Sequence, residues 1–302
     1  MTNTESQVRA EHLATLPLQA TGPGGSFGDG MVGQFRDIWG HRELLSMLTR
    51  RELKARYKDS TLGFFWSLLR PLALLLIYYI ALGQFLGAAR SIPDFAIFIY
   101  TGLTAWGLFS ETVTAGTASI VSNGGLIKKV YFPREIFPLS ALGSSLFNFV
   151  IQLVILTAAT VISRDIPTCV RWLYLPVSLG VIVTWALAWS LLLSAINVYL
   201  RDVGYLVEIA LMIAFWASPI VYSWQLVADA LPSEALERLY LSNPMTLAVL
   251  GFQHTFWVKG DSQPPPPNLA ISLVIALLVG VLAVWGAQRV FARLQGNFAQ
   301  EL

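Results

Sequence analysis

The sequence is poor in charged residues and in cysteine. Asp, Glu, Lys and Arg make up only 13% of the 302 residues, whereas 55% are hydrophobic and the mean hydropathy is +0.60. Soluble globular domains carry about a quarter charged residues, so this composition predicts a membrane protein. Cys169 is the single cysteine, which excludes an internal disulfide and a cysteine metal cluster.

Motifs that mark enzymatic chemistry are missing as well. The three histidines, His12, His41 and His254, lie far apart, and the sequence has no HExxH, GxSxG or nucleotide-binding motif. The glycines in LPLQATGPGGSFGDG are not followed by Gly-Lys-Ser/Thr, as a phosphate loop requires. We therefore expect no catalytic residue, metal site or cofactor on this chain. A net charge of only +2 gives no reason to expect a nucleic acid partner.

Long apolar segments dominate the sequence instead. Crossing a bilayer as an α-helix takes about 20 residues, and lipid admits only helices or closed barrels. Six segments are long enough, and they cover residues 62–87, 95–121, 136–163, 172–197, 203–223 and 268–290. We therefore predict an all-α integral membrane fold with six transmembrane helices.

The remaining residues give the predicted domain order. Residues 1–32 are rich in Pro, Gly and Ser, so we expect a disordered cytoplasmic tail. Residues 33–61 contain an amphipathic interfacial helix, which precedes the six-span domain at 62–292. Residues 293–302 form a second cytoplasmic tail.

The region around the end of the fifth span has two further signals. Ser218-Pro219 should kink this span, because proline removes a backbone donor and clashes with the preceding turn. Residues 224–267 contain two short apolar pieces divided at Asn243-Pro244, each too short to span a bilayer. We interpret these pieces as two short extracytoplasmic helices at the outer leaflet.

Lysine and arginine are distributed unequally between the two sides of the predicted bundle. With a cytoplasmic N-terminus, fourteen of these residues lie inside and five lie outside. Cytoplasmic loops carry the excess of positive charge, so both termini are predicted to be cytoplasmic.

Residues 123–138, NGGLIKKVYFPREIFP, then form the cytoplasmic loop between spans two and three. Topology alone accounts for the positive charge of this loop. It does not account for the large apolar residues, which a loop that needs only solubility would not keep. We interpret these residues as a docking surface, formed by Leu126, Ile127, Val130, Tyr131 and Phe132.

The segment IWGHRELLSMLTR at residues 38–50 is amphipathic, as is typical of a helix in the headgroup plane. A basic run follows it, made of Arg50, Arg51, Lys54, Arg56 and Lys58. Anionic lipid attracts such a run with about 1 kcal/mol per charge. A lipid anchor and a specific binding role both stay open for these residues.

Polar and aromatic side chains also occur inside the predicted spans. Glu111 is the one acidic residue well inside a span, so it should face protein or water rather than lipid. It either makes a polar contact or lines a path. The mid-span aromatics pack the core or, taken together, offer stacking faces to a sliding sugar chain. The candidates for such a glycan path are Tyr78, Tyr79, Trp106, Phe215 and Trp216.

Six blocks of the sequence resemble, in order, the permease subunits of ABC transporters that export lipid-linked polysaccharides such as O-antigen, teichoic acid and capsule. They are RRELKARYKDSTLGFFWSLLRPL at 50–72, WGLFSE at 106–111, NGGLIKKVYFPREIFPL at 123–139, LSAINVYLRDV at 193–203, SPIVY at 218–222 and SNPMT at 242–246. The resemblance covers residues 34–292 and is specific for the family but not for the cargo.

This resemblance implies a homodimer in the bacterial plasma membrane, with two copies of a separate ATPase that binds ATP and Mg. The substrate would be a polyprenyl-diphosphate-linked glycan. The loop would be a coupling helix that meets the ATPase through Leu126, Ile127, Lys128, Lys129, Val130, Tyr131 and Phe132. The amphipathic helix would be a gate helix, on which Arg50, Arg51, Lys54, Arg56 and Lys58 meet the carrier diphosphate.

Several alternatives to this hypothesis stay open. The chain is an ABC permease for a drug or small lipid in the first alternative and an ion-coupled secondary carrier in the second. Such carriers usually show internal repeats and several intramembrane ionisable groups, whereas only Glu111 is well placed here. A membrane glycosyltransferase would need a carboxylate cluster or metal motif, which we do not find. The rich use of Ala, Trp and Arg is typical of a high-GC bacterium, in which the cargo would be a cell-wall galactan.

Overall fold

The computed structural model describes residues 39–57, 65–128, 132–165, 167–168 and 170–302, and every regular element in these ranges is a helix. The prediction of an all-α fold is confirmed for this part of the chain. Arg42–Leu302 form one compact unit, to which all the helices named below belong.

Three helical segments are both long enough and apolar enough to cross a membrane. They are α8 (Ile136–Ile162), Arg171–Tyr199 with the short 3-10 helix η2 (Arg171–Leu173) and α9 (Tyr174–Tyr199), and Leu269–Asn297 with α14 (Leu269–Leu294) and η4 (Gln295–Asn297). The predicted segments 136–163, 172–197 and 268–290 are therefore confirmed as helices of membrane-spanning length and hydropathy.

The other predicted spans are helical but shorter or more polar. The first consists of α4 (Phe65–Tyr78) and the π-helix η1 (Tyr79–Phe85). The second is α6 (Phe95–Ser122), whose 28 residues extend about 42 Å but include Glu111 and many Thr, Ser and Gly residues. The fifth is α10 (Val203–Trp216). The full count of six spans stays a prediction.

The predicted kink at Ser218-Pro219 is wrong, because α10 ends at Trp216 instead of bending. Pro219 has no N–H to continue a helix and disfavours helical geometry in the residue before it. The chain turns here, and the Ile220 N–H donates to the Ser218 carbonyl at 2.8 Å.

Residues 224–267 contain three α-helices where the sequence pattern predicts two. They are α11 (Trp224–Ala230), α12 (Glu234–Leu241) and α13 (Pro244–Phe256). The predicted break at Asn243-Pro244 is confirmed, since the Asn243 side chain caps α13 by accepting from the Met245 N–H at 3.0 Å. Only α12 is largely exposed, whereas α13 is buried against α6 and α9.

Helix α9 is the centre of the bundle and packs against α6, α8, α13 and α14. Three helical glycines face hydroxyl side chains of α9. The pairs are Gly116 with Ser190, Gly251 with Ser178, and Gly280 with Thr184. A Cβ atom at any of these glycines would overlap the opposing hydroxyl oxygen. The small residues therefore allow three helices to approach α9 closely, as is common in membrane bundles.

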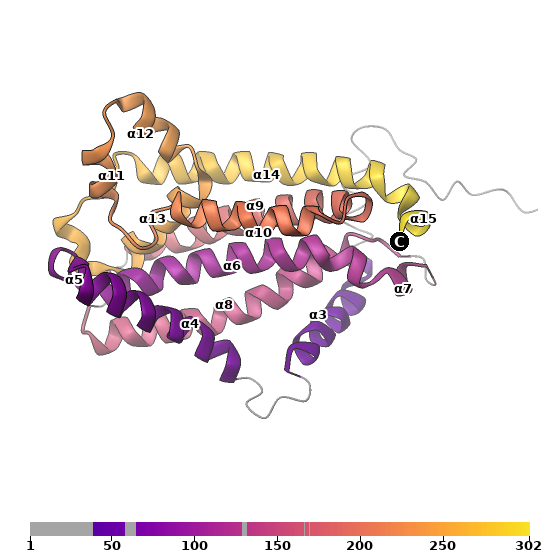
Figure 1. Ribbon diagram of the computed structural model, residues 1–302, viewed down its shortest axis with the longest axis horizontal. Helices are drawn as coiled ribbons and strands as arrows, with labels where there is room; N and C mark the ends of the chain where they lie inside the picture. The colour runs from indigo at the N-terminus through magenta and orange to yellow at the C-terminus, as the bar shows by residue number, and fades with distance from the viewer. Residues whose placement is uncertain (1–38, 58–64, 129–131, 166, 169) are drawn as a thin grey trace, which may run out of the picture. The chain divides into compact units, whose positions relative to one another are not determined.

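Two groups of short elements lie at opposite ends of the bundle (Figure 1). One end carries α7 (Gly124–Ile127) and α15 (Phe298–Glu301), and we call it the α7 end. The other carries α5 (Ala88–Ser91), α11 and α12, and we call it the α12 end. The amphipathic helix α3 (Arg42–Tyr57) packs against α8.

Candidate functional site

Helix α3 presents the predicted basic face. Arg50, Arg51 and Lys54 are exposed, and they line an open depression on the outward side of the helix. The opposite side is docked: Leu48 is buried, and Glu52 accepts a hydrogen bond from the Ser140 hydroxyl at 2.6 Å. The side chain of Arg56 and all of Lys58 lie outside the described residues.

Arg51 also joins α3 to the end of α6. Its guanidinium donates to the Asn123 side-chain oxygen, and the Asn123 amide donates to the Ser119 carbonyl at 2.8 Å. Asn123 is the residue between α6 and α7. The gate-helix candidate and the coupling-loop candidate are therefore directly hydrogen-bonded.

The loop after α6 differs from the predicted docking surface. Ile127 and Phe132 are 6% and 8% exposed, and Leu126 is half-buried. The interpretation of Ile127 and Phe132 as an exposed docking surface is wrong, because these side chains pack into the chain's own core. Lys128 is exposed. Lys129, Val130 and Tyr131 lie outside the described residues.

The core that buries these residues comes from distant segments. It contains Leu48 of α3, Ile120 of α6, Phe137 of α8, Leu191 and Val198 of α9, and Phe291 and Phe298 near the end of the chain. Residues 293–302, which we expect to form a tail, complete α14 and then form η4 and α15. Phe298 is the sequence signal for this packing that the prediction missed.

Glu111 faces the protein, as expected for a carboxylate inside a span. Its Oε1 atom accepts a hydrogen bond from the Asn148 side chain of α8 at 2.8 Å. Asn197 of α9 makes a second polar contact with α6 by donating to the Thr117 carbonyl at 3.0 Å. Sequence reasoning missed both asparagines, although an amide inside an apolar span is a signal for interhelical hydrogen bonding.

The structure brings four of the five predicted path aromatics together. Phe215 of α10 stacks on Tyr78 with ring centroids 6.0 Å apart, and Trp106 of α6 meets its edge at 5.8 Å. Trp216 adjoins Phe215 at 5.6 Å and is the most exposed of the four. Tyr79 turns away and packs on Phe95. In the isolated chain these rings are packing contacts among α4, α6 and α10.

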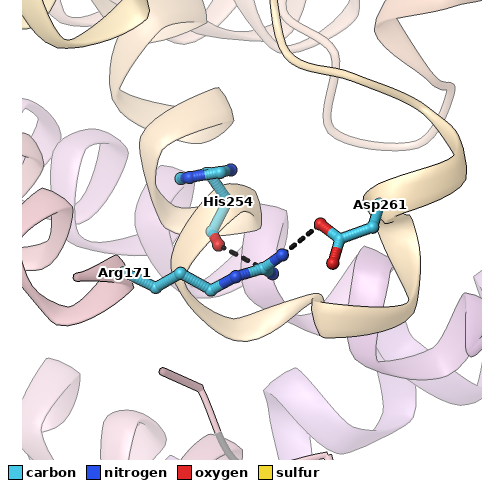
Figure 2. Close-up of polar contacts among 3 residues, drawn as sticks. All are labelled: Arg171, His254 and Asp261. Atoms are coloured by element: carbon cyan, nitrogen blue, oxygen red, sulfur yellow. Dashed lines mark hydrogen bonds and ion pairs between the residues drawn. The ribbon is translucent and has the colours of Figure 1, made fainter. Parts of the chain in front are cut away.

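A polar network at the α12 end was not predicted. Arg171, which is only 9% exposed, forms an ion pair with Asp261 and donates to the His254 carbonyl at 3.4 Å (Figure 2). Burial lowers the pKa of the His254 imidazole, and the positive charge of Arg171 lowers it further. The network ties η2, which directly precedes α9, to α13 and to the 3-10 helix η3 (Val258–Ser262).

Lys259 forms a second charged cluster nearby. Its Nζ atom lies 2.8 Å from a carboxylate oxygen of Asp94 and 2.9 Å from one of Asp165. These hydrogen bonds raise the pKa of Lys259, and the bond from Lys259 lowers the pKa of Asp165. The loop after α8, the start of α6 and η3 are thus held at one point.

Comparison with known proteins shows which family the chain belongs to. The profile of the ABC-2 type transporter family matches residues 43–257. The O-antigen export system permease protein RfbA of Myxococcus xanthus is 31% identical over 275 residues, which cover 90% of this chain and all of that protein. A protein of the same name from Klebsiella pneumoniae is 30% identical over 217 residues, or 71% of this chain and 80% of its own length. This chain, with its apolar helical bundle, is therefore an integral membrane protein of the ABC-2 type transporter family.

Proposed function

We propose that this protein is the permease subunit of an ATP-driven exporter for a polyprenyl-diphosphate-linked polysaccharide. The observation that carries the proposal is the match to a protein named as an O-antigen export permease along that protein's whole length. The helical bundle, with three helices long and apolar enough to cross a membrane, is compatible with this role.

In this proposal two copies of the chain form the pathway, and two copies of a separate ATPase bind ATP and Mg beneath them. Each copy crosses the plasma membrane six times with both termini in the cytoplasm. The α7 end faces the cytoplasm and the α12 end faces outward. The excess of lysine and arginine in the loops on the α7 side supports this orientation.

The gate helix would act through its exposed cations. Arg50, Arg51 and Lys54 lie on the exposed face of α3, opposite the face that packs against α8. Arginine offers a planar fork of donors that matches phosphate oxygens, and lysine adds a point charge. We propose that this face receives the diphosphate of the carrier lipid as the substrate enters from the inner leaflet.

The coupling loop would meet the ATPase through its exposed residues. Gly125 of α7 and Lys128, which follows α7, are exposed, whereas Ile127 and Phe132 are buried and anchor the loop. The seven residues from Leu126 to Phe132 would then divide into anchoring and contacting residues. Among the five candidates for the glycan path, Trp216 is the best placed to touch a passing glycan, because 53% of it is exposed.

Depletion of the protein in its own bacterium tests the proposal. We expect lipid extracts to accumulate a polyprenyl-diphosphate-linked glycan, and surface polysaccharide to disappear, until the gene is expressed again. Mass spectrometry of the accumulated lipid would show whether its glycan is the cell-wall galactan that we propose as cargo. Drug sensitivity without accumulation would support a drug permease instead. Export that persists with an ATPase-inactive partner would support an ion-coupled carrier.

A further inference from the structure

The segment Gln295–Leu302, here called the α15 segment, is built into the core beneath the coupling loop. Phe298 is fully buried, and its ring lies 5.5 Å from that of Phe291 and 6.2 Å from that of Tyr199. Phe132 from the loop belongs to the same buried cluster. The α15 segment therefore shares one apolar core with the loop, α9 and α14.

Polar contacts also connect the loop to the α15 segment. The Arg134 guanidinium donates to the Gln295 carbonyl and lies 5.7 Å from the centre of the Phe298 ring. The next residue, Glu135, is 5% exposed and hydrogen-bonds with the side chains of Gln288 and Gln295. Separating the loop from the α15 segment would leave buried polar groups without partners, which is costly.

Two further contacts extend the connection. The Tyr199 hydroxyl donates to the Leu294 carbonyl at 2.7 Å, which fixes the end of α14 to the end of α9. At the other side of the loop, a Cβ atom at Gly124 would lie 3.5 Å from the Leu302 Cβ. The α15 segment thus contacts the loop at both of its described ends, at α7 and at Arg134.

We propose that the α15 segment is a clamp that holds the coupling loop to α14 and α9, so that loop and segment move as one body. This inference rests on the proposed function, in which the ATPase pushes on the loop. A loop held only by its own two ends would absorb that push by local bending. Because the clamp joins the loop to α14 and α9, the push is carried into the centre of the bundle.

A disulfide between Gly124→Cys and Leu302→Cys, in a Cys169→Ser background, tests the clamp. The distance between Gly124 and Leu302 suits a disulfide, whose Cβ atoms lie about 3.5–4.5 Å apart. We expect oxidation with copper phenanthroline to link the two positions within one chain. Export and stimulation of the ATPase should stay unchanged in the linked protein. Failure to link, or a linked protein that stops exporting, would overturn the proposal.

Gly125→Cys with Leu302→Cys is the matched control. A Cβ at Gly125 has no atom within 4 Å, so this pair should not link under the same oxidation. Equal linking of both pairs would show a freely moving segment and would also overturn the clamp.

Phe298→Ala removes the ring at the centre of the clamp. We expect ATPase-coupled export to fall about tenfold, within the usual range for coupling between two sites. The oxidised Gly124→Cys/Leu302→Cys disulfide should restore export in this variant, and reduction should abolish the rescue. Normal export by Phe298→Ala, or a loss that oxidation does not rescue, contradicts the proposal.

The readouts separate this proposal from the proposed function. If the unaltered protein exports no glycan, the function is wrong, but linking and ATPase stimulation still report on the clamp. If glycan export is normal and the cysteine pair does not link, only the clamp is wrong.

Discussion

Helix α6 approaches α9 most closely at Gly116, and this contact allows a quantitative prediction. A Cβ at position 116 would overlap the Ser190 hydroxyl oxygen, and it would lie 2.6 Å from the Ser190 Cβ and 3.3 Å from its Cα. The obstacle includes backbone, so the helices must separate in Gly116→Ala. Overpacking of this kind costs about 2 kcal/mol. With an unfolding entropy of about 2.1 cal/mol/K per residue, that cost lowers the unfolding temperature of a 302-residue chain by about 3 °C.

Thermal unfolding of the purified protein in detergent is the assay, with Gly286→Ala as the matched control. Gly286 also lies in a helix, α14, but a Cβ there has no atom within 4 Å. Alanine is the better helix former by about 1 kcal/mol, so Gly286→Ala should unfold at or above the wild-type temperature. An unfolding temperature of Gly116→Ala equal to that of this control would refute the close contact.

A compensating change sharpens the test. Ser190→Gly alone should destabilise the protein by about 1 kcal/mol, because glycine inside a helix gives the unfolded chain more freedom. In the Gly116→Ala background it removes the two obstructing atoms, so the double variant should unfold at a higher temperature than Gly116→Ala. If the two losses simply add, the inferred α6–α9 geometry is wrong.

Three further predictions concern the polar groups. Replacing Arg50, Arg51 and Lys54 with glutamine should lower glycan export about tenfold, measured as the amount of surface polysaccharide. The reason is that losing one charge-assisted contact costs about 1–2 kcal/mol of binding free energy, which is about a tenfold loss of affinity. Glu111→Gln should keep the hydrogen bond from Asn148 of α8 and unfold near the wild-type temperature. Glu111→Leu should lose this bond and about 1 kcal/mol of unfolding free energy. The folded state lowers the pKa of His254, so stability should be complete above its unfolded value of 6.5 and fall as the pH drops below it, measured as unfolding temperature between pH 8 and 5.

Each of these predictions has its own control. Arg238→Gln removes an exposed cation of α12 and should leave export unchanged, so an equal loss there would make the α3 effect nonspecific. Asn148→Leu should destabilise the protein as much as Glu111→Leu, since both break the same bond. Replacing His254 with Phe, which cannot be protonated, should flatten the pH dependence. A profile that keeps its slope in this variant would assign the effect to another group.

Local sequence patterns predicted the helices well, because hydrophobic periodicity and turn residues act over a few neighbours. The segments 136–163 and 268–290 match α8 and α14 closely, and the break at Asn243-Pro244 lies where α13 begins. The same reasoning failed at Ser218-Pro219. A proline permits either a kink or a helix end, and neighbouring residues alone do not decide between them.

Partners of side chains were predicted less well. The sequence placed Glu111 inside the bundle. Its bond to Asn148, which lies 37 positions later in the sequence, depends on how α6 and α8 pack against each other. Four mid-span aromatics meet around Phe215, while Tyr79, the next residue after Tyr78, contacts Phe95 instead, because successive side chains of a helix point in different directions. The Arg171 network joins residues separated by up to 90 positions, and no local pattern indicates it.

The sequence by itself determined that this protein is an integral membrane helical bundle, because composition and segment length leave no other way to satisfy its backbone in lipid. Its ordered blocks also pointed to the transporter family. Only the tertiary structure decided what covers each apolar face. Ile127 and Phe132 looked like a surface for a partner, yet Phe291 and Phe298, more than 150 residues away, bury them. Hydrophobicity is a local property of the chain, whereas burial depends on which distant segment folds against it.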